Sequence, residues 1–328
     1  MRAWQLEDLG DPWENLKLVD VAPPEPTGAL ARIEVEGCDL NFADILQCQG
    51  EYQVKLEPPF VPGMGASGRV VSVGPESSLD VGQRVVGSTT GPWGGFAEQA
   101  LVNPADVHPL PDPVDGVVAA GLHVTYGTAW FSLHRRGQLQ PGESVLVLAA
   151  AGGVGSAAVQ MASAHGCWVL AAAGGPEKVQ VCRDLGADLA IDYNNDDLYA
   201  TVMDATSGRG VDVVYDPVGG SYFDIARRLV AWEGRLLVVG FASGTIPSAP
   251  ANHALVKNYS VVGVHMGGYR GRMPNVLDEC YDEVYAMLAD GRIEPLISER
   301  VTLQGLPTAL QSLADRTSTG RLVVDMAR

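Results

Sequence analysis

Two different rhythms of apolar and polar positions divide the chain. In the first third, residues 31–36 alternate apolar and polar side chains, as a half-buried strand does. Three more short segments, bounded by glycine or proline, share this character: residues 68–74, 83–87 and 94–102. Strands spaced this closely predict a small β-barrel.

From about residue 119 the pattern changes to an alternation of helices and strands. Apolar runs predict strands at residues 145–149, 168–172, 189–191, 211–215, 236–240 and 261–264. Buried strands that alternate with helices form a doubly wound parallel sheet. The end of the chain is mixed, with an amphipathic helix predicted at 276–289 and a last strand at 321–324.

The strand predicted at 145–149 is followed by a turn of small residues and then by a segment with helical spacing. Ala150, Gly152 and Gly155 make an A-x-G-x-x-G variant of the dinucleotide-binding fingerprint. Small residues let the backbone approach a pyrophosphate, and the N–H groups at the start of the helix face its phosphates. A Gly-rich turn can also merely connect two elements, but the strand before it and the helix after it favour a nucleotide site.

The next strand, 168–172, indicates which nucleotide. An NAD site usually ends this strand with Asp or Glu, which binds the ribose 2′-hydroxyl. Here the small residues 173–175 follow, and Lys178 comes within one turn. Room for a 2′-phosphate with a cation beside it favours NADPH. The alternative is that Lys178 is an ordinary solvated lysine, and Glu177 would oppose a phosphate if it pointed inward.

Composition narrows the classes of function. The 328 residues suit two domains, and a net charge of −17 argues against nucleic acid or an anionic membrane as a partner. No apolar run is long enough to span a bilayer, and the N-terminus begins no signal peptide. The five cysteines are odd in number and scattered, which predicts neither disulfides nor a CxxC metal site. We expect a cytoplasmic protein with reduced thiols.

Several motifs occur in one order along nearly the whole chain: Asn41-Phe42-Ala43-Asp44 with Gly50-x-Tyr52, and residues 60–63, 80–85, 150–155, 216–220 and 319–324. Together they resemble the zinc-free quinone oxidoreductase branch of the medium-chain dehydrogenase/reductase superfamily. The resemblance implies an α/β fold, a doubly wound parallel Rossmann sheet inserted into a GroES-like β-barrel catalytic domain. Residues 1–120 and 265–328 would form the catalytic domain, and residues 121–264 the dinucleotide-binding domain.

Zinc separates the branches of this superfamily. A catalytic zinc needs about three Cys, His or carboxylate ligands. The alcohol dehydrogenase branch has a His-Glu pair in the stretch that matches residues 62–66, where this chain has neither, and Cys38 is left without partner ligands. The four-cysteine structural lobe expected soon after Trp93 is missing. We therefore expect no metal. The family often has Glu at the place of Gly65, so a carboxylate is lost near the cleft.

The resemblance implies an NADPH-dependent, zinc-independent enzyme that transfers hydride to quinones or α,β-unsaturated carbonyls. The nicotinamide supplies the hydride, so the protein needs only to hold the reactants and to donate a hydrogen bond to the developing oxyanion. The candidate catalytic residues are Asn41, Asp44, Tyr52 and Thr125. Asn41 and Tyr52 could donate that bond. Asp44 could instead be a helix-cap carboxylate, and Tyr52 a packing aromatic.

The resemblance also assigns the residues that bind the cofactor. Lys178 and Tyr193 are expected to hold the 2′-phosphate, and Arg321 to close the same pocket. His265 either lines the nicotinamide pocket or simply ends a strand. The full set is Ala150, Gly152, Gly153, Val154, Gly155, Gly174, Lys178, Tyr193, Val218, Gly240, Phe241, Val264, His265, Met266 and Arg321.

Two other functions remain open. One is an enoyl-thioester reductase for acyl-CoA or acyl carrier protein, although the acidic balance argues mildly against it and only Arg270 and Arg272 could form a basic patch. The other is a non-catalytic NADPH-binding scaffold. The strand at 261–264 would leave an apolar sheet edge open, so we expect a homodimer that pairs these edges. The partner of the reaction would be a small quinone or enone.

Overall fold

The computed structural model describes residues 1–328 and separates them into two compact units. The first unit joins Met1–Val124 to Ile297–Arg328, and the second comprises Thr125–Leu296. The second unit is therefore inserted into the first, as the sequence predicts. None of the helices is both long enough and apolar enough to cross a membrane.

The second boundary differs from the one predicted at residues 264 and 265, because the segment up to Leu296 packs within the second unit. Helix α9 (Pro274–Ala289) is held against α3 (Gly116–Trp130): the indole of Trp130 donates to Glu283 at 2.7 Å. A Cβ at Gly127 would lie 2.9 Å from the Tyr281 hydroxyl, so the two helices touch closely. The predicted amphipathic helix is present, but its apolar face covers the nucleotide-binding unit.

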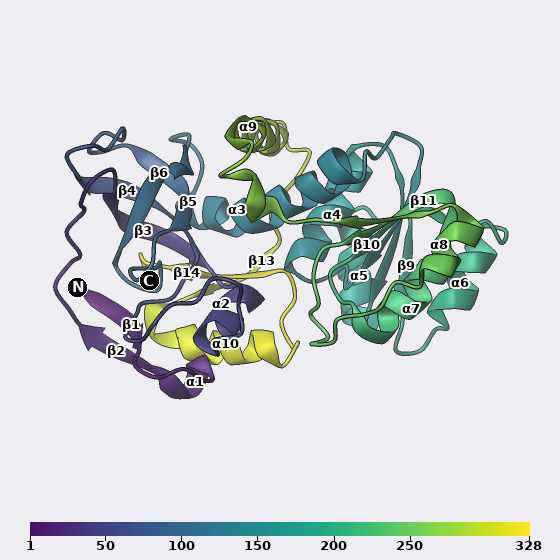
Figure 1. Cartoon of the computed structure of the whole chain (residues 1–328), viewed down its shortest axis with the longest axis horizontal. Coiled ribbons are helices and arrows are strands. Elements are labelled where there is room, and N and C mark those ends of the chain that lie inside the picture. The colour runs from purple at the N-terminus through teal and green to yellow at the C-terminus, as the bar shows by residue number, and fades with distance from the viewer. The chain divides into compact units, whose positions relative to one another are not determined.

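The first unit is built mainly from strands. Its elements are β1 (Arg2–Leu6), α1 (Pro12–Asn15), β2 (Leu16–Asp20), β3 (Ala31–Asp39), α2 (Phe42–Cys48), β4 (Gly65–Val73), β5 (Arg84–Thr89), β6 (Gln99–Pro109), β13 (Ile297–Val301), the 3₁₀ turn Leu303–Gly305, α10 (Leu306–Ala314) and β14 (Arg321–Asp325). The main sheet has the order β13-β14-β3-β4-β5-β6, and β6 pairs back onto β3. This closure forms the predicted small barrel around buried side chains such as Ile33, Val35 and Val70 (Figure 1).

The strand predicted at 94–102 begins only at Gln99. Gly94 and Gly95 belong to a loop that passes close over its neighbours. A Cβ at Gly94 would lie 2.3 Å from the carbonyl oxygen of Pro62, and one at Gly95 would lie 2.7 Å from the sulfur of Cys38. The glycines therefore serve a close backbone approach rather than a strand.

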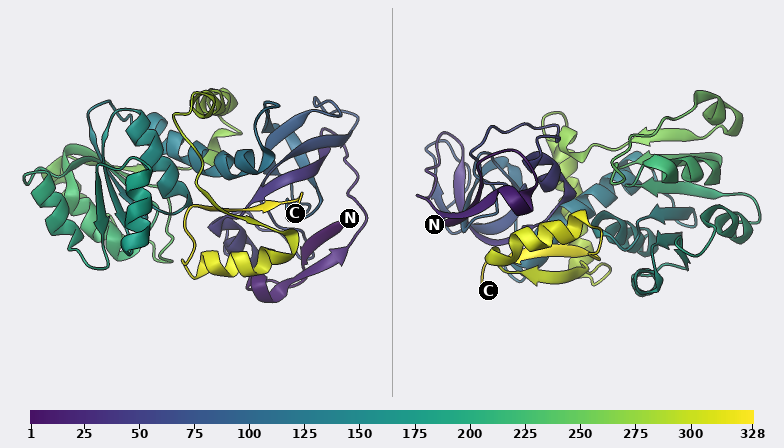
Figure 2. Two further views of the ribbon diagram at one scale, coloured as in Figure 1. Left: turned by 180° about the vertical axis from the view of Figure 1, so that it is seen from behind. Right: turned by 90° about the horizontal axis from the view of Figure 1, so that it is seen from below.

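The second unit contains a six-stranded parallel sheet. Its elements are β7 (Ser144–Leu148), α4 (Gly153–Ala164), β8 (Trp168–Ala173), α5 (Pro176–Asp184), β9 (Leu189–Asp192), α6 (Leu198–Ala205), β10 (Val211–Asp216), α7 (Gly220–Leu229), β11 (Val230–Val238), α8 (Ala251–Lys257), β12 (Ser260–Gly263), the 3₁₀ turn Met266–Tyr269 and α9, while α3 continues into a π-helical turn, Phe131–Arg136. Helices lie on both sides of the sheet (Figures 1 and 2). This is the doubly wound fold that the alternation predicts.

The strand order β12-β11-β10-β7-β8-β9 reverses direction between β7 and β10. In sheets of this kind ligands bind at the carboxyl ends of the strands, next to such a reversal. All five residues of β7 are buried, because helices cover both of its faces. The fingerprint turn follows directly after this strand.

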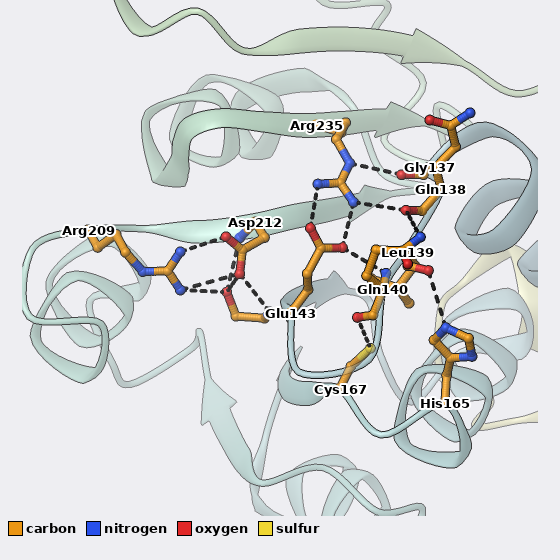
Figure 3. A network of polar contacts seen from close by, with 11 residues as sticks. Gly137, Gln138, Leu139, Gln140, Glu143, His165, Cys167, Arg209, Asp212 and Arg235 are labelled. Atoms are coloured by element: carbon orange, nitrogen blue, oxygen red, sulfur yellow. Dashed lines mark hydrogen bonds and ion pairs between the residues drawn. The ribbon is translucent and has the colours of Figure 1, made fainter.

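The opposite, amino-terminal edge of the sheet is fixed by ionic bonds (Figure 3). Arg235 of β11 pairs with Glu143 at 2.6 Å, and Arg209 pairs with Asp212 of β10 at 2.6 Å. The carboxylate of Asp212 also accepts from the N–H and the hydroxyl of Ser144, the first residue of β7. These contacts join the central strands at the edge away from the nucleotide fingerprint.

Candidate functional site

The fingerprint turn leaves a helix N-terminus free for a ligand. Helix α4 begins at Gly153, and its first internal bond runs from the N–H of Ser156 to the carbonyl of Gly152. The N–H groups of Gly153, Val154 and Gly155 therefore have no acceptor within the helix. A Cβ at Gly155 would lie 2.2 Å from the carbonyl oxygen of Ala149, so only glycine allows the helix to start this close to the strand. Three N–H groups and the positive end of a 12-residue helix suit a phosphate.

The tip of β8 has the open form that the sequence predicts. A Cβ at Gly174 would lie 3.0 Å from the Tyr193 ring and 3.2 Å from its hydroxyl, so these two residues are direct neighbours. Lys178 is half-buried in the first turn of α5, while Glu177 is exposed. Of the residues expected around the 2′-phosphate, the structure places Gly174 against Tyr193, and Lys178 follows them in the first turn of the next helix.

One carboxylate lies close to this tip, and it is occupied by other bonds. Asp192, the last residue of β9, accepts from the N–H of Gly175 at 2.8 Å, from the N–H of Asn194 at 3.1 Å and from the amide of Asn195 at 2.8 Å. These bonds, led by the one from Gly175, hold the pKa of Asp192 below its usual value. Asp192 therefore shapes the loops around the tip, and it ends β9, whereas the ribose-binding acid of an NAD site ends the strand that β8 matches.

The remaining predicted cofactor residues of the second unit share one edge. Val218, Gly240, Phe241, Val264, His265 and Met266 follow the carboxyl ends of β10, β11 and β12, and all are at least partly exposed. The turn after β10 is shaped by Asp216, whose buried carboxylate accepts from the N–H groups of Val218 and Gly219 at 2.8 and 2.9 Å. His265 is exposed and precedes the 3₁₀ turn at Met266, so its side chain is available at this edge.

In the first unit, Asn41 belongs to a buried polar cluster. Its side-chain oxygen accepts from the guanidinium of Arg321 at 2.9 Å, and the same nitrogen of Arg321 donates to Asp39 at 2.5 Å. All three residues are less than a tenth exposed. The amide nitrogen of Asn41, one oxygen of Asp39 and the Nε of Arg321 are buried without a hydrogen-bond partner. Such atoms usually have a water, a ligand or a catalytic task to account for them.

Arg321 therefore has other partners than those expected of it. The sequence assigns it to the 2′-phosphate pocket beside Lys178 and Tyr193, but its guanidinium is bound to Asp39 and Asn41 inside the first unit. The physical reason is the buried carboxylate of Asp39, because a buried anion needs a cation beside it. Burial raises the pKa of Asp39, and the positive charge of Arg321 works against that rise. The side-chain amide of Asn41 also lowers this pKa, although its nitrogen makes no hydrogen bond of good geometry.

Asp44 has the helix-capping position that the sequence leaves open as its alternative role. It is fully buried, and its two oxygens accept from the N–H of Asn41 at 2.8 Å and from the N–H of Met64 at 2.9 Å. Burial and, next, the charge of Asp39 raise the pKa of Asp44 to about 7. With both oxygens occupied by backbone groups, Asp44 fixes the start of α2.

Of the other two catalytic candidates, only one is accessible. Tyr52 is partly exposed in the turn after α2, where its N–H donates to the carbonyl of Leu46 at 3.1 Å. Thr125 is completely buried within α3. The two lie in different units.

No group of three His, Cys, Asp or Glu side chains in residues 1–328 is arranged to hold a metal ion. Cys38 is fully buried, and burial raises the pKa of its thiol well above the ordinary value. A metal binds the thiolate, so this cysteine is a poor ligand. All five cysteines are free and buried.

Sequence reasoning missed Asp39. The one available signal was a charged residue that follows Gly37 and Cys38 at the buried end of β3, since an acid there needs a partner. The partner lies 282 positions away in sequence, on β14, and no local pattern reveals it.

Comparison with known proteins supports the same family. Residues 28–112 match the alcohol dehydrogenase GroES-like domain, and residues 153–282 match the domain described as zinc-binding dehydrogenase. A quinone oxidoreductase-like protein 2 homolog from Nematostella vectensis is 39% identical over 99% of this chain and 88% of its own length.

Solved structures of quinone oxidoreductases are also similar to this chain. The quinone oxidoreductase from Thermus thermophilus, also determined in complex with NADPH, has a TM-score of 0.85 and 34% identity, and the match covers 99% of this chain and 100% of that one. The quinone oxidoreductase from Pseudomonas syringae has a TM-score of 0.91 and 30% identity, over 99% of both chains. The chain therefore belongs to the quinone oxidoreductase family of the medium-chain dehydrogenase/reductase superfamily.

Proposed function

We propose that this protein is an NADPH-dependent reductase of quinones or α,β-unsaturated carbonyls that works without zinc. One observation carries the proposal most directly. The fingerprint turn needs glycine at position 155 and leaves three N–H groups free, while the neighbouring strand ends in small residues with no acid at its tip, Gly174 against Tyr193, and is followed by Lys178. These residues fit a dinucleotide that carries a 2′-phosphate. NADPH is also the cofactor named for the Thermus structure.

In this proposal, some residues of the chain bind the cofactor and others stabilise the charge that develops on the acceptor. Bound NADPH supplies a hydride to an electron-poor carbon of the acceptor. The backbone of 153–155 would hold the pyrophosphate, and Lys178 with Tyr193 would hold the 2′-phosphate. The amide of Asn41, whose nitrogen has no partner within the chain, would donate to the acceptor oxygen as negative charge develops there. Tyr52 is the second candidate donor.

Zinc independence is supported by the chemistry of the available side chains. The sites that could supply ligands are either buried with a raised pKa, like Cys38, or occupied by backbone N–H groups, like Asp44. A Lewis acid is not required to activate a quinone or enone if a hydrogen bond can stabilise the oxyanion. The free, buried cysteines support a reducing compartment such as the cytoplasm.

We also propose a homodimer formed through the free edge of β12. This strand pairs only with β11, and Val261 is 39% exposed. Nearby, α8 has no buried residue, and its Leu255 and Val256 are 76% and 73% exposed. An open apolar edge next to an apolar helix face is the kind of surface that a second copy would cover.

A panel of acceptors tests the function. The purified protein should oxidise NADPH with simple quinones or enones, followed by the loss of NADPH absorbance, and more slowly with NADH. Turnover confined to enoyl-CoA or enoyl carrier protein would favour the thioester reductase. Tight binding of NADPH without turnover of any acceptor would make the protein a scaffold.

A further inference from the structure

The carboxylate of Asp39 depends on a residue from another strand. Gly65 is the first residue of β4, and a Cβ at this position would lie 2.6 Å from Oδ1 of Asp39. Carbon and oxygen atoms that are not bonded do not approach so closely, and Asp39 is completely buried. A side chain at position 65 and the observed carboxylate of Asp39 therefore exclude one another.

The glycine at position 65 therefore leaves no empty space, because the carboxylate of Asp39 lies where a side chain would begin. The resemblance implies that relatives often carry Glu here, and its loss could have widened the cleft. Instead, Oδ1 of Asp39, from β3, occupies the space next to Gly65 where the first atom of a side chain would lie.

Asp39 in turn fixes Arg321. The strands β3 and β14 are antiparallel neighbours with Asp39 opposite Val323. Asn41, two residues after Asp39, and Arg321, two residues before Val323, therefore lie in the same direction from this pair. One Nη of Arg321 bridges the two side chains, at 2.5 Å to Asp39 and 2.9 Å to Asn41. Removing the charge of Asp39 would leave this guanidinium buried without an anion.

Arg321 determines the orientation of the Asn41 amide. A guanidinium has donors only, so the atom of Asn41 that faces it must be the oxygen. The amide nitrogen is then on the side away from Arg321, where it lowers the pKa of Asp39 but makes no hydrogen bond of good geometry. The backbone of Asn41 is fixed as well, since its N–H donates to Asp44.

We propose that Asp39 and Arg321 are positioning residues that present the amide nitrogen of Asn41 to the reacting oxygen, and that Gly65 is the residue that makes room for them. This rests on the proposed function, because it needs Asn41 to donate to the acceptor. The geometric part, a fixed amide and mutual exclusion between positions 39 and 65, stands apart from any activity.

The first test joins kinetics to a spectroscopic signature. Asp39→Asn keeps the shape and removes the charge, so kcat for a quinone should fall at least tenfold while the Kd for NADPH, bound in the second unit, is unchanged. The side-chain amide resonance of Asn41, identified by its loss in Asn41→Ala, should be sharp in the wild type and should shift or broaden in Asp39→Asn. Asp325→Asn is a matched control, because Asp325 is another buried carboxylate of this sheet, paired with Arg300; it should change neither kcat nor the resonance.

The second test needs no activity. Gly65→Ala should lower the Tm of the wild type, because its Cβ meets Asp39, and should lower it far less in an Asp39→Ala background. Equal losses in both backgrounds would overturn the exclusion. An unchanged kcat and an unchanged resonance in Asp39→Asn would overturn the positioning role even if the wild type is an active reductase. A wild type without turnover refutes the proposed function alone, since the resonance still decides whether Asp39 orients Asn41.

Discussion

Replacing Lys178 with alanine should weaken the binding of NADPH and leave the binding of NADH nearly unchanged. Lys178 is half-buried in the first turn of α5, directly after the strand tip where Gly174 lies against Tyr193. Of the two carboxylates near this tip, Asp192 is bound to the backbone of Gly175 and Glu177 is exposed. A charge-assisted bond to phosphate contributes roughly 1.5–3 kcal/mol. Because the side chain is partly solvated, we expect the lower end, about 1.5–2 kcal/mol, which corresponds to a rise in Kd of about ten- to thirty-fold.

The assay is titration of each cofactor into the purified protein, followed by calorimetry or by quenching of intrinsic fluorescence. Lys178→Arg should retain most of the affinity, since it keeps a cation in the same turn. Arg183→Ala is the matched control: it removes one positive charge from the last turn of the same helix, α5, where the side chain is exposed. It should leave both Kd values within about twofold.

The comparison of the two cofactors decides the question. NADH has no 2′-phosphate, so a loss that affects NADPH and NADH equally would mean that Lys178 only supports the local fold. No loss for either cofactor would mean that Lys178 is a solvated lysine. In both cases the preference for NADPH would rest on the missing acid at the tip of β8 alone.

Three further outcomes are expected. Elemental analysis should find no stoichiometric zinc, and chelators should change neither Tm nor turnover; about one tightly bound zinc per chain would contradict this. Light scattering should find a dimer at micromolar concentration, and Val261→Asp should convert it to a monomer. Leu9→Asp, at an exposed position of the first unit, is the control and should leave the dimer intact. A monomeric wild type would refute the pairing of β12 edges. Finally, burial alone would raise the pKa of Asp212, but the bonds from Arg209 and Ser144 lower it to about 2. The stability that this lowered pKa provides is complete above the unfolded pKa of about 3.9 and is lost as the pH falls toward 2. Asp212→Asn should therefore cost about 2 kcal/mol of unfolding free energy at neutral pH and much less near pH 2. An equal cost at both pH values would contradict the linkage between this pKa and stability.

The second unit was predictable because its signals are local. The strand at β7, the small-residue turn and the helix α4 follow one another within about 20 residues, and each is specified by its own composition. The acid-free tip of β8 is likewise visible within a few residues of the strand. The sequence could not show that every side chain is excluded at position 155, where the helix approaches the carbonyl of Ala149. A fingerprint glycine looks the same in sequence whether it serves a ligand or only a turn.

The first unit was harder because its contacts are distant in sequence. Strands β1 and β2 form a separate two-stranded sheet, and β1 is tied to the rest by isolated bridges, Ala3 to Ala97 and Leu6 to Phe60. Strand β13 pairs with β14 in parallel, and only one of its five residues, Val301, is buried, so it has no apolar run that predicts a strand. Pairing across such distances follows from closure of the barrel and not from local propensity.

The same distance explains why the sequence did not indicate the partners that Arg321 has in the structure, Asp39 and Asn41. From the sequence, an arginine near the C-terminus is a free cation, and a phosphate is a natural place for it. Asp39, however, removes that freedom: a buried carboxylate without a cation would be strongly disfavoured, and Arg321 is the residue that the register of β14 against β3 brings to it. A Cβ at position 65 would lie 2.6 Å from Oδ1 of Asp39, so the carboxylate can hold its observed place only beside glycine. The residue at position 65 therefore bears on two other side chains, on Asp39 directly and on Arg321 through the bond between them.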